Sequence, residues 1–178
     1  VLDIEGEVQP PDGPGAIRVA ELKTASYSIS LPLRLGALAC AAPSDCLEVL
    51  SAIGRHLGIA YQLTDDDLGA FGEPERTGKP VGSDIRSGKR TELLRLAMTR
   101  ADPVDRQFLF DWVGDEAAPD DALVRIQHIM EHSGARAAHR KIIGLHTHLA
   151  VALIEAKLPD ELARGLRAVI DALAERTT

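Results

Sequence analysis

"LEVLSAIGRHLGIAYQLTDDDLGAF", residues 47–71, is the stretch of sequence that decides the fold class. Apolar side chains recur along it every three or four residues, which is the period of a helix with one buried face. The apolar stripe comprises Leu47, Leu50, Ile53, Leu57, Ala60 and Leu63. We therefore predict a long helix that ends at about Phe71.

The helical period recurs through most of the chain without a strong strand signal, so we predict an all-α helical bundle. Further helices are expected at 17–42, with a kink at Pro32, and at 91–101, 103–113, 120–133, 135–157 and 159–175. The 178 residues are enough for a single domain, 1–178. Residues 1–16 are rich in Pro and Gly and indicate a loop or linker. Residues 72–90 are long and aperiodic, as in segments that close over active sites.

The composition narrows the class of protein. Hydrophobic residues make up 45% of the chain, which indicates a globular protein rather than a disordered one. The net charge of −7 argues against a nucleic-acid partner, and any anionic ligand would need local cations or a metal. No apolar stretch has the length of a transmembrane segment. Two cysteines do not make a disulfide framework, so we expect a cytoplasmic protein.

Three adjacent carboxylates, residues 65–67, lie at the end of the long predicted helix. They repel one another and face the negative end of the helix dipole, an arrangement that a hard divalent cation would relieve. Mg²⁺ usually binds through one or two carboxylates together with substrate phosphates. The aspartates therefore predict Mg²⁺ as a cofactor.

Lysines in three segments could meet the phosphates of such a ligand. Lys79 and Lys89 follow glycines in "TGKP" and "SGKR", and Lys23 precedes Thr24 in "ELKTASYS" at 21–28. A lysine on flexible backbone suits a segment that closes over a phosphate. Carboxylates and lysines together predict a site for a Mg²⁺–diphosphate complex.

Residues 20–101 resemble the second half of a trans-type polyprenyl (isoprenyl diphosphate) synthase. Three motifs carry the resemblance: "KTAxYS" at Lys23–Ser28, "FQxxDDxxD" at Tyr61–Gly69, and "FGDPxxTGKxxGxDLxxGK" at Phe71–Lys89. The resemblance implies an all-α enzyme, usually a homodimer, that lengthens an allylic diphosphate with isopentenyl diphosphate. In that family Mg²⁺ bridges two aspartate-rich motifs and the allylic diphosphate. The likeness of the second motif favours a short-chain product such as geranylgeranyl diphosphate.

The resemblance also assigns roles by position. Asp65 would bind Mg²⁺, and Asp66 would do so directly or through water. Lys23 and Lys79 would hold the allylic diphosphate. The remaining residues would line its pocket or belong to the segment that closes it: Thr24, Tyr27 and Gln62 for the pocket, and Asp84 and Lys89 for the segment.

Two departures from the family pattern matter. The last aspartate of the second motif is Gly69 here, and Asp67 cannot replace it because a residue two positions from Asp65 points elsewhere on a helix. A water would have to stand in. In addition, nothing in 1–60 matches the first aspartate-rich motif, and the pair Asp120–Asp121 is best read as charge at a helix start. We therefore expect the C-terminal part of a longer enzyme or, alternatively, a non-catalytic partner subunit of a heteromeric synthase.

A rival motif is "HIMEH", in which His128, Glu131 and His132 fit the H-x-x-E-H pattern of a zinc peptidase. A catalytic zinc site needs a third protein ligand, and the spacing marks none. A helix surface is the simpler interpretation. We likewise expect His139, His146 and His148 at the surface or at the edge of the core.

Overall fold

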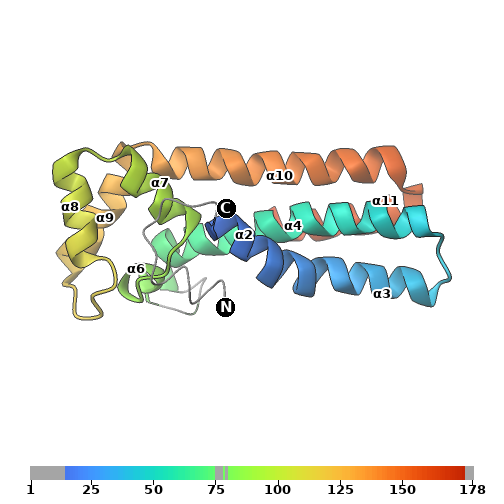
Figure 1. Cartoon of the computed structure of the whole chain (residues 1–178), viewed down its shortest axis with the longest axis horizontal. Coiled ribbons are helices and arrows are strands. Elements are labelled where there is room, and N and C mark those ends of the chain that lie inside the picture. Colours follow the sequence, from blue (N-terminus) through green and yellow to red (C-terminus); the bar gives the residue numbers. More distant parts are fainter. Residues whose placement is uncertain (1–14, 75–77, 79, 175–178) are drawn as a thin grey trace. The chain divides into compact units, whose positions relative to one another are not determined.

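The computed structural model describes residues 15–74, 78 and 80–174, and every regular element among them is a helix. Figure 1 shows their arrangement along the chain. The first half contains α2 (Gly15–Ala20), the π-helix η1 (Glu21–Ser30), α3 (Leu31–Ala39) and α4 (Ser44–Phe71). The second half contains α6 (Ser83–Arg86), α7 (Glu92–Arg100), α8 (Pro103–Trp112), α9 (Asp120–His132), α10 (Ala135–Lys157) and α11 (Asp160–Ala174). The all-α prediction is confirmed.

The helices form two compact units. The first unit contains Leu63–Lys141, and the second contains Arg18–Gln62 together with the segment that begins at Ile142. Helices α4 and α10 each supply residues to both units. None of the helices in the described ranges is long and apolar enough to cross a membrane.

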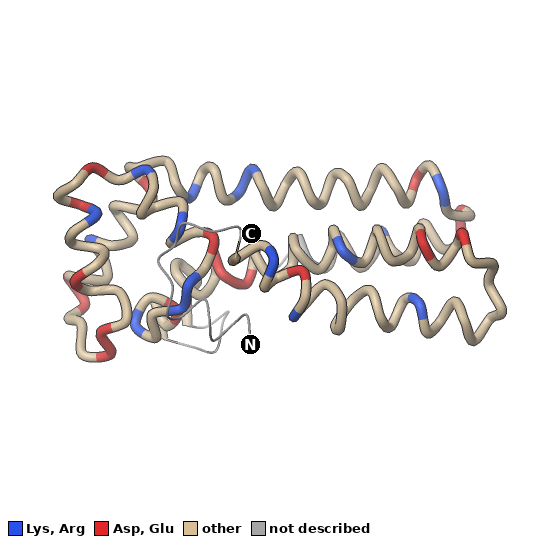
Figure 2. The backbone as a smooth tube through the Cα atoms, in the orientation of Figure 1, with Lys and Arg blue, Asp and Glu red and all other residues tan. Residues whose placement is uncertain are grey.

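The core of the second unit is built from three helices that run lengthwise beside one another in Figure 1. Apolar residues spaced three or four apart on each helix meet there: Leu50, Ile53 and Leu57 of α4, Ala150 and Ile154 of α10, and Leu166 and Ile170 of α11. The stripe predicted on α4 is therefore buried, except for Leu47, which is half-buried. Between Lys141 and Glu155, α10 contains no Lys, Arg, Asp or Glu, in keeping with this packing, and Figure 2 shows a long tan stretch along this helix.

The segment 21–30 differs from the expected α-helix because it forms a π-helix against α4. Residues five apart lie one turn apart on a π-helix, and residues four apart do so on an α-helix. Ala25 and Ser30 of η1 therefore face Gly58 and Gly54 of α4 in register. A Cβ at Gly54 would lie 2.6 Å from the Ser30 Cα, and a Cβ at Gly58 would overlap with Ala25. Only glycine permits this approach of the two backbones.

The first unit is a cluster of shorter helices, α6 to α9, with clear local start signals. The Thr91 hydroxyl accepts a hydrogen bond from the Leu94 N–H at 3.1 Å, and Asp102 accepts bonds from the first N–H groups of α8. Both are N-caps that fix where a helix begins. Asp120 and Asp121 lie in the first turn of α9, as predicted, and Asp120 pairs with Arg86 at 2.8 Å.

Candidate functional site

The three aspartates at the end of α4 occupy different environments. Asp65 is half-buried, whereas Asp66 and Asp67 are buried. All three belong to the last two turns of α4, but one helical residue turns each side chain about 100° from the next, so they face different neighbours. The run is therefore not a set of equivalent ligands.

Lys89 bridges two carboxylates in the first unit. Its Nζ donates to Asp66 Oδ1 at 2.9 Å and to Asp84 Oδ2 at 3.1 Å. Burial opposes the charge of Lys89, but the two carboxylates outweigh it and raise the pKa of Lys89 above its ordinary value. The structure thus brings together Asp66, Asp84 and Lys89, three of the residues assigned by resemblance, around one ammonium group.

The backbone of 82–89 fixes where Asp84 and Lys89 lie. Gly82 and Gly88 both have positive φ, at 69° and 67°, so the chain turns sharply before and after α6. The Lys89 N–H donates to the Asp84 carbonyl at 3.0 Å, which holds the two residues in one turn. Buried Ile85 anchors the segment, and its carbonyl accepts from the Gly114 N–H at 3.0 Å.

Gly69 lies directly under the Asp84 carboxylate. A Cβ added at Gly69 would be 2.9 Å from Asp84 Oδ1 and would overlap with Oδ2 and Cγ. The family pattern has an aspartate at position 69. In this chain the residue is glycine, and the Asp84 carboxylate lies over it.

Asp67 has a structural role that the sequence interpretation missed. Its carboxylate pairs with Arg136 at 3.1 Å and with Arg140 at 3.1 Å, both from the start of α10. The Arg136 guanidinium also stacks 3.6 Å from the centroid of the Phe71 ring. Asp67 therefore ties the end of α4 to α10. Asp67 and Arg136 are 69 residues apart in the chain, so no local sequence pattern indicates that they pair.

The remaining described site residues lie in the second unit. The Thr24 hydroxyl, which is buried in η1, donates to Gln62 Oε1 of α4 at 2.5 Å. Lys23 is exposed, and Tyr27 is 73% exposed. Thr24 and Gln62 are thus joined by a hydrogen bond between η1 and α4. Lys79 lies outside the described residues.

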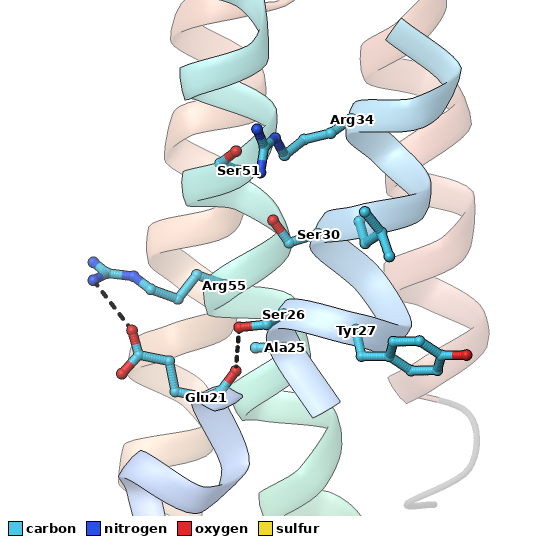
Figure 3. A pocket seen from close by; sticks show the side chains of 9 residues that line it. Glu21, Ala25, Ser26, Tyr27, Ser30, Arg34, Ser51 and Arg55 are labelled. Carbon is cyan, nitrogen blue, oxygen red and sulfur yellow. Dashed lines mark hydrogen bonds and ion pairs between the residues drawn. The ribbon is translucent and has the colours of Figure 1, made fainter. Parts of the chain in front are cut away.

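A separate groove lies between η1, α3 and α4 in the second unit (Figure 3), with a volume of about 450 Å³. Figure 3 shows Arg34 reaching toward Ser51 while Tyr27 points away from them. Arg55 pairs with Glu21 at 3.8 Å, and the Ser26 hydroxyl donates to the Glu21 carbonyl at 2.9 Å. Of the residues assigned to the diphosphate pocket, Tyr27 lines this groove, whereas Lys23 and Thr24 do not.

The histidines show no zinc site. His128 and His132 are exposed and stack with ring centroids 3.9 Å apart, while Glu131 pairs with Arg136 at 2.6 Å. Within the described ranges, no three His, Cys, Asp or Glu side chains are grouped so that they could hold a metal. Among the described residues, the zinc peptidase motif therefore gains no third ligand.

His139 corrects the expectation of a surface or core-edge position, because it is fully buried in α10. Neither of its ring nitrogens has a hydrogen-bond partner among the described residues. Burial lowers the pKa of His139, and Asp67 and Glu92 only partly oppose this. The imidazole is therefore held neutral inside the first unit.

The donor set fits Mg²⁺ better than a metal held by protein alone. Mg²⁺ keeps several waters and binds through one or two carboxylates plus phosphates, so it needs no cage of three protein ligands. Asp66 and Asp84 already hold a cation, the Lys89 ammonium, between them. This end of α4 is accordingly suited to a cation that arrives with its own anionic ligand.

This chain is similar to known proteins in sequence and in fold. The family model of polyprenyl synthetase matches residues 16–130. Over 123 residues the chain is 40% identical to the (2E,6E)-farnesyl diphosphate synthase of Mycobacterium tuberculosis, which covers 67% of this chain and 34% of the relative. Over 119 residues it is 39% identical to the geranylfarnesyl diphosphate synthase of Aeropyrum pernix, covering 67% of this chain and 36% of the relative.

A crystal structure is similar over nearly the whole chain. It is a geranylgeranyl pyrophosphate synthase from Corynebacterium glutamicum complexed with isoprenyl diphosphate and magnesium. The TM-score is 0.88 at 35% sequence identity, covering 99% of this chain and 50% of that chain. The present chain therefore spans about a third of the length of the curated relatives and half of the solved chain.

Proposed function

This chain belongs to the polyprenyl synthetase family, and on that premise we propose that it carries the diphosphate-binding part of a prenyltransferase. The reaction joins an allylic diphosphate to isopentenyl diphosphate. The allylic C–O bond breaks and its electron pair leaves with the diphosphate. The isopentenyl double bond then attacks the allylic cation, and a proton is lost from the new chain.

The chain's own residues would bind and shield the leaving diphosphate. Lys23 and Lys79 would donate hydrogen bonds to its oxygens, and Lys89 would do so when it leaves Asp66 and Asp84. The hydrogen bond from Thr24 to Gln62 fixes both side chains beside Lys23 on η1. Ammonium groups placed where negative charge develops lower the barrier to ionisation more than they stabilise the bound substrate.

Mg²⁺ would be held by Asp65 and Asp66, and when bound it would neutralise charge on the diphosphate. The bridge between Asp66, Lys89 and Asp84 is the observation that supports this part of the proposal. It brings an acidic residue of the second motif together with two residues of the third. As the resemblance implies, we expect the enzyme to act as a homodimer.

The proposal is tested by calorimetric titration of the chain with inorganic pyrophosphate in the presence and absence of Mg²⁺. We expect Mg²⁺-dependent binding, and we expect Asp65→Ala and Lys79→Ala each to weaken it by at least tenfold. The reason is that, in this proposal, Asp65 would bind the cation and Lys79 would bind the anion. Loss of one charged hydrogen bond typically costs about 1.5–3 kcal/mol, which is roughly 10- to 100-fold in affinity.

Asp171→Ala is the matched control, because Asp171 is an exposed aspartate on α11. It should bind pyrophosphate like the parent chain. Undiminished Mg²⁺-dependent binding in both Asp65→Ala and Lys79→Ala would contradict the site assignment.

A second candidate is a non-catalytic partner subunit that pairs with a complete synthase and alters its product length. It is motivated by the sequence, because only one aspartate-rich motif occurs in the 178 residues. Mixing the chain with a complete synthase and sizing labelled products distinguishes the candidates. A changed product length without turnover by the chain itself favours the subunit, and turnover by the chain excludes it.

A further inference from the structure

The carboxylate of Asp84 occupies the space that a side chain at position 69 would need. A Cβ at Gly69 would overlap with Oδ2 and Cγ of Asp84 and lie 2.9 Å from Oδ1. Such a distance to a carboxylate is far inside normal contact, so any side chain at 69 would require Asp84 to move. A side chain at position 69 and the Asp84 carboxylate in its present position therefore exclude each other.

Asp84 is held in that volume by groups other than Gly69. Lys89 Nζ bonds its Oδ2 at 3.1 Å and bonds Asp66 Oδ1 at 2.9 Å. The Asp66 and Asp84 side chains are only 8% and 13% exposed. Two carboxylates that share one ammonium in a poorly hydrated place are fixed relative to each other.

Position 69 is one helical turn from both Asp65 and Asp66, so a carboxylate there would belong to the same acidic face. That face lacks its own third carboxylate because residue 69 is glycine. The Asp84 carboxylate comes to the same place from α6 instead. The charge on this face is thereby kept, although its source is a different segment.

We propose that Asp84 supplies the carboxylate that position 69 lacks, with Gly69 providing the room for it and Lys89 holding it beside Asp66 until a Mg²⁺–diphosphate ligand arrives. This inference rests on the proposed function for its ligand. Its steric part, the exclusion between a side chain at 69 and Asp84, is independent of any ligand. Asp84, a residue of the third motif, thus supplies negative charge beside the second motif.

The steric part is tested by melting temperatures without metal. Gly69→Ala should lower the melting temperature in the parent chain, because its Cβ collides with Asp84. In an Asp84→Ala background the same substitution should raise it, because alanine is the better helix former once the collision is gone. Gly69→Ala that stabilises both backgrounds equally would overturn the inference.

The charge part is tested by calorimetry with Mg²⁺ and inorganic pyrophosphate. Asp84→Ala and Asp84→Asn should each weaken binding at least tenfold, and Asp84→Asn should do so with little change in melting temperature. The double variant Gly69→Asp/Asp84→Ala should bind within about threefold of the parent, whereas Gly69→Ala/Asp84→Ala should stay weak. Equal affinity of these two double variants for pyrophosphate would overturn the proposal that Asp84 supplies the carboxylate that position 69 lacks.

These outcomes separate the inference from the proposed function. If the parent chain shows no Mg²⁺-dependent pyrophosphate binding, the proposed function fails, and the supply of charge to a metal fails with it. The sign reversal of Gly69→Ala between backgrounds would then still establish the steric exchange. If the parent binds and Asp84→Ala binds equally well, the inference alone is overturned.

Discussion

At the scale of single residues, the three aspartates of the run have different neighbours. Asp65 and Asp66 are the residues that we propose as Mg²⁺ ligands, whereas Asp67 pairs with Arg136 and Arg140. Its side chain is 10% exposed, while those of Arg136 and Arg140 are 21% and 56% exposed. Burial makes the pair with Arg136 the stronger one, because exposed pairs are screened by solvent.

We predict that Asp67→Asn lowers the free energy of unfolding by about 2 kcal/mol. This is less than the roughly 3–5 kcal/mol for breaking a fully buried pair, because both arginines retain access to water. Urea denaturation would measure the loss. A double-mutant cycle should give a larger coupling energy with Arg136→Met than with Arg140→Met.

Asp67 and Asp65 should differ in their effect on pyrophosphate affinity. Asp67→Asn should leave Mg²⁺-dependent binding within about twofold of the parent, because its carboxylate faces α10 rather than the acidic face of α4. A tenfold loss of affinity in a folded Asp67→Asn chain would mean that Asp67 is a ligand after all.

At the scale of helices, sequence periodicity located most elements well. The predicted helices at 120–133 and 135–157 match α9 and α10 to within one residue, because long amphipathic stripes with glycine or proline at their ends are strong signals. The π form of 21–30 was not foreseeable. A π turn differs from an α turn by one residue, and its cause is the fit to Gly54 and Gly58 on another helix.

The same limit applies to the candidate site. The order of three motifs identified its residues, but it could not predict the contact between Gly69 and Asp84. Position 69 is fifteen residues from Asp84, and the two meet only because Gly82 and Gly88 turn the chain around α6. Sequence spacing along one helix cannot reveal a carboxylate that arrives from another segment.

We predict that Gly58→Ala destabilises the second unit by about 1–3 kcal/mol, because the new methyl group overlaps with Ala25 and forces η1 away from α4. Gly144→Ala on α10 is the control. Nothing lies within 4 Å of a Cβ there, so it should stabilise by roughly 0.5–1 kcal/mol. Urea midpoints with an unchanged m-value would measure both. A gain of stability in Gly58→Ala would refute the close approach.

At the scale of the whole molecule, each unit contains histidines that are held neutral. In the first unit, burial lowers the pKa of His139; Arg136 and Arg140 act in the same direction, and Asp67 and Glu92 oppose them. In the second unit, the Nδ1 atoms of His56 and His146 lie 3.0 Å apart. Burial lowers both of their pKa values, and so does the positive charge of Arg55. Folding therefore opposes protonation of His56, His139 and His146.

The sign of the resulting pH dependence follows from proton counting. In an unfolded chain His56, His139 and His146 are protonated at about pH 6.5, whereas in the folded chain they are protonated only at lower pH. Between these two pKa values the unfolded state binds more protons, so the free energy of unfolding falls as the pH falls. The stabilising contribution is complete above about pH 6.5 and is lost on acidification.

We therefore predict that the free energy of unfolding decreases from pH 7.5 to pH 5, a range above the ordinary pKa of carboxylates at about 4. Each histidine contributes at most about 1.4 kcal/mol per pH unit. His139→Leu and His146→Gln should each flatten the dependence, because each removes a group that is neutral when folded. Urea denaturation at a series of pH values would measure these slopes, and a stability that rises on acidification would contradict the neutral state of the buried histidines.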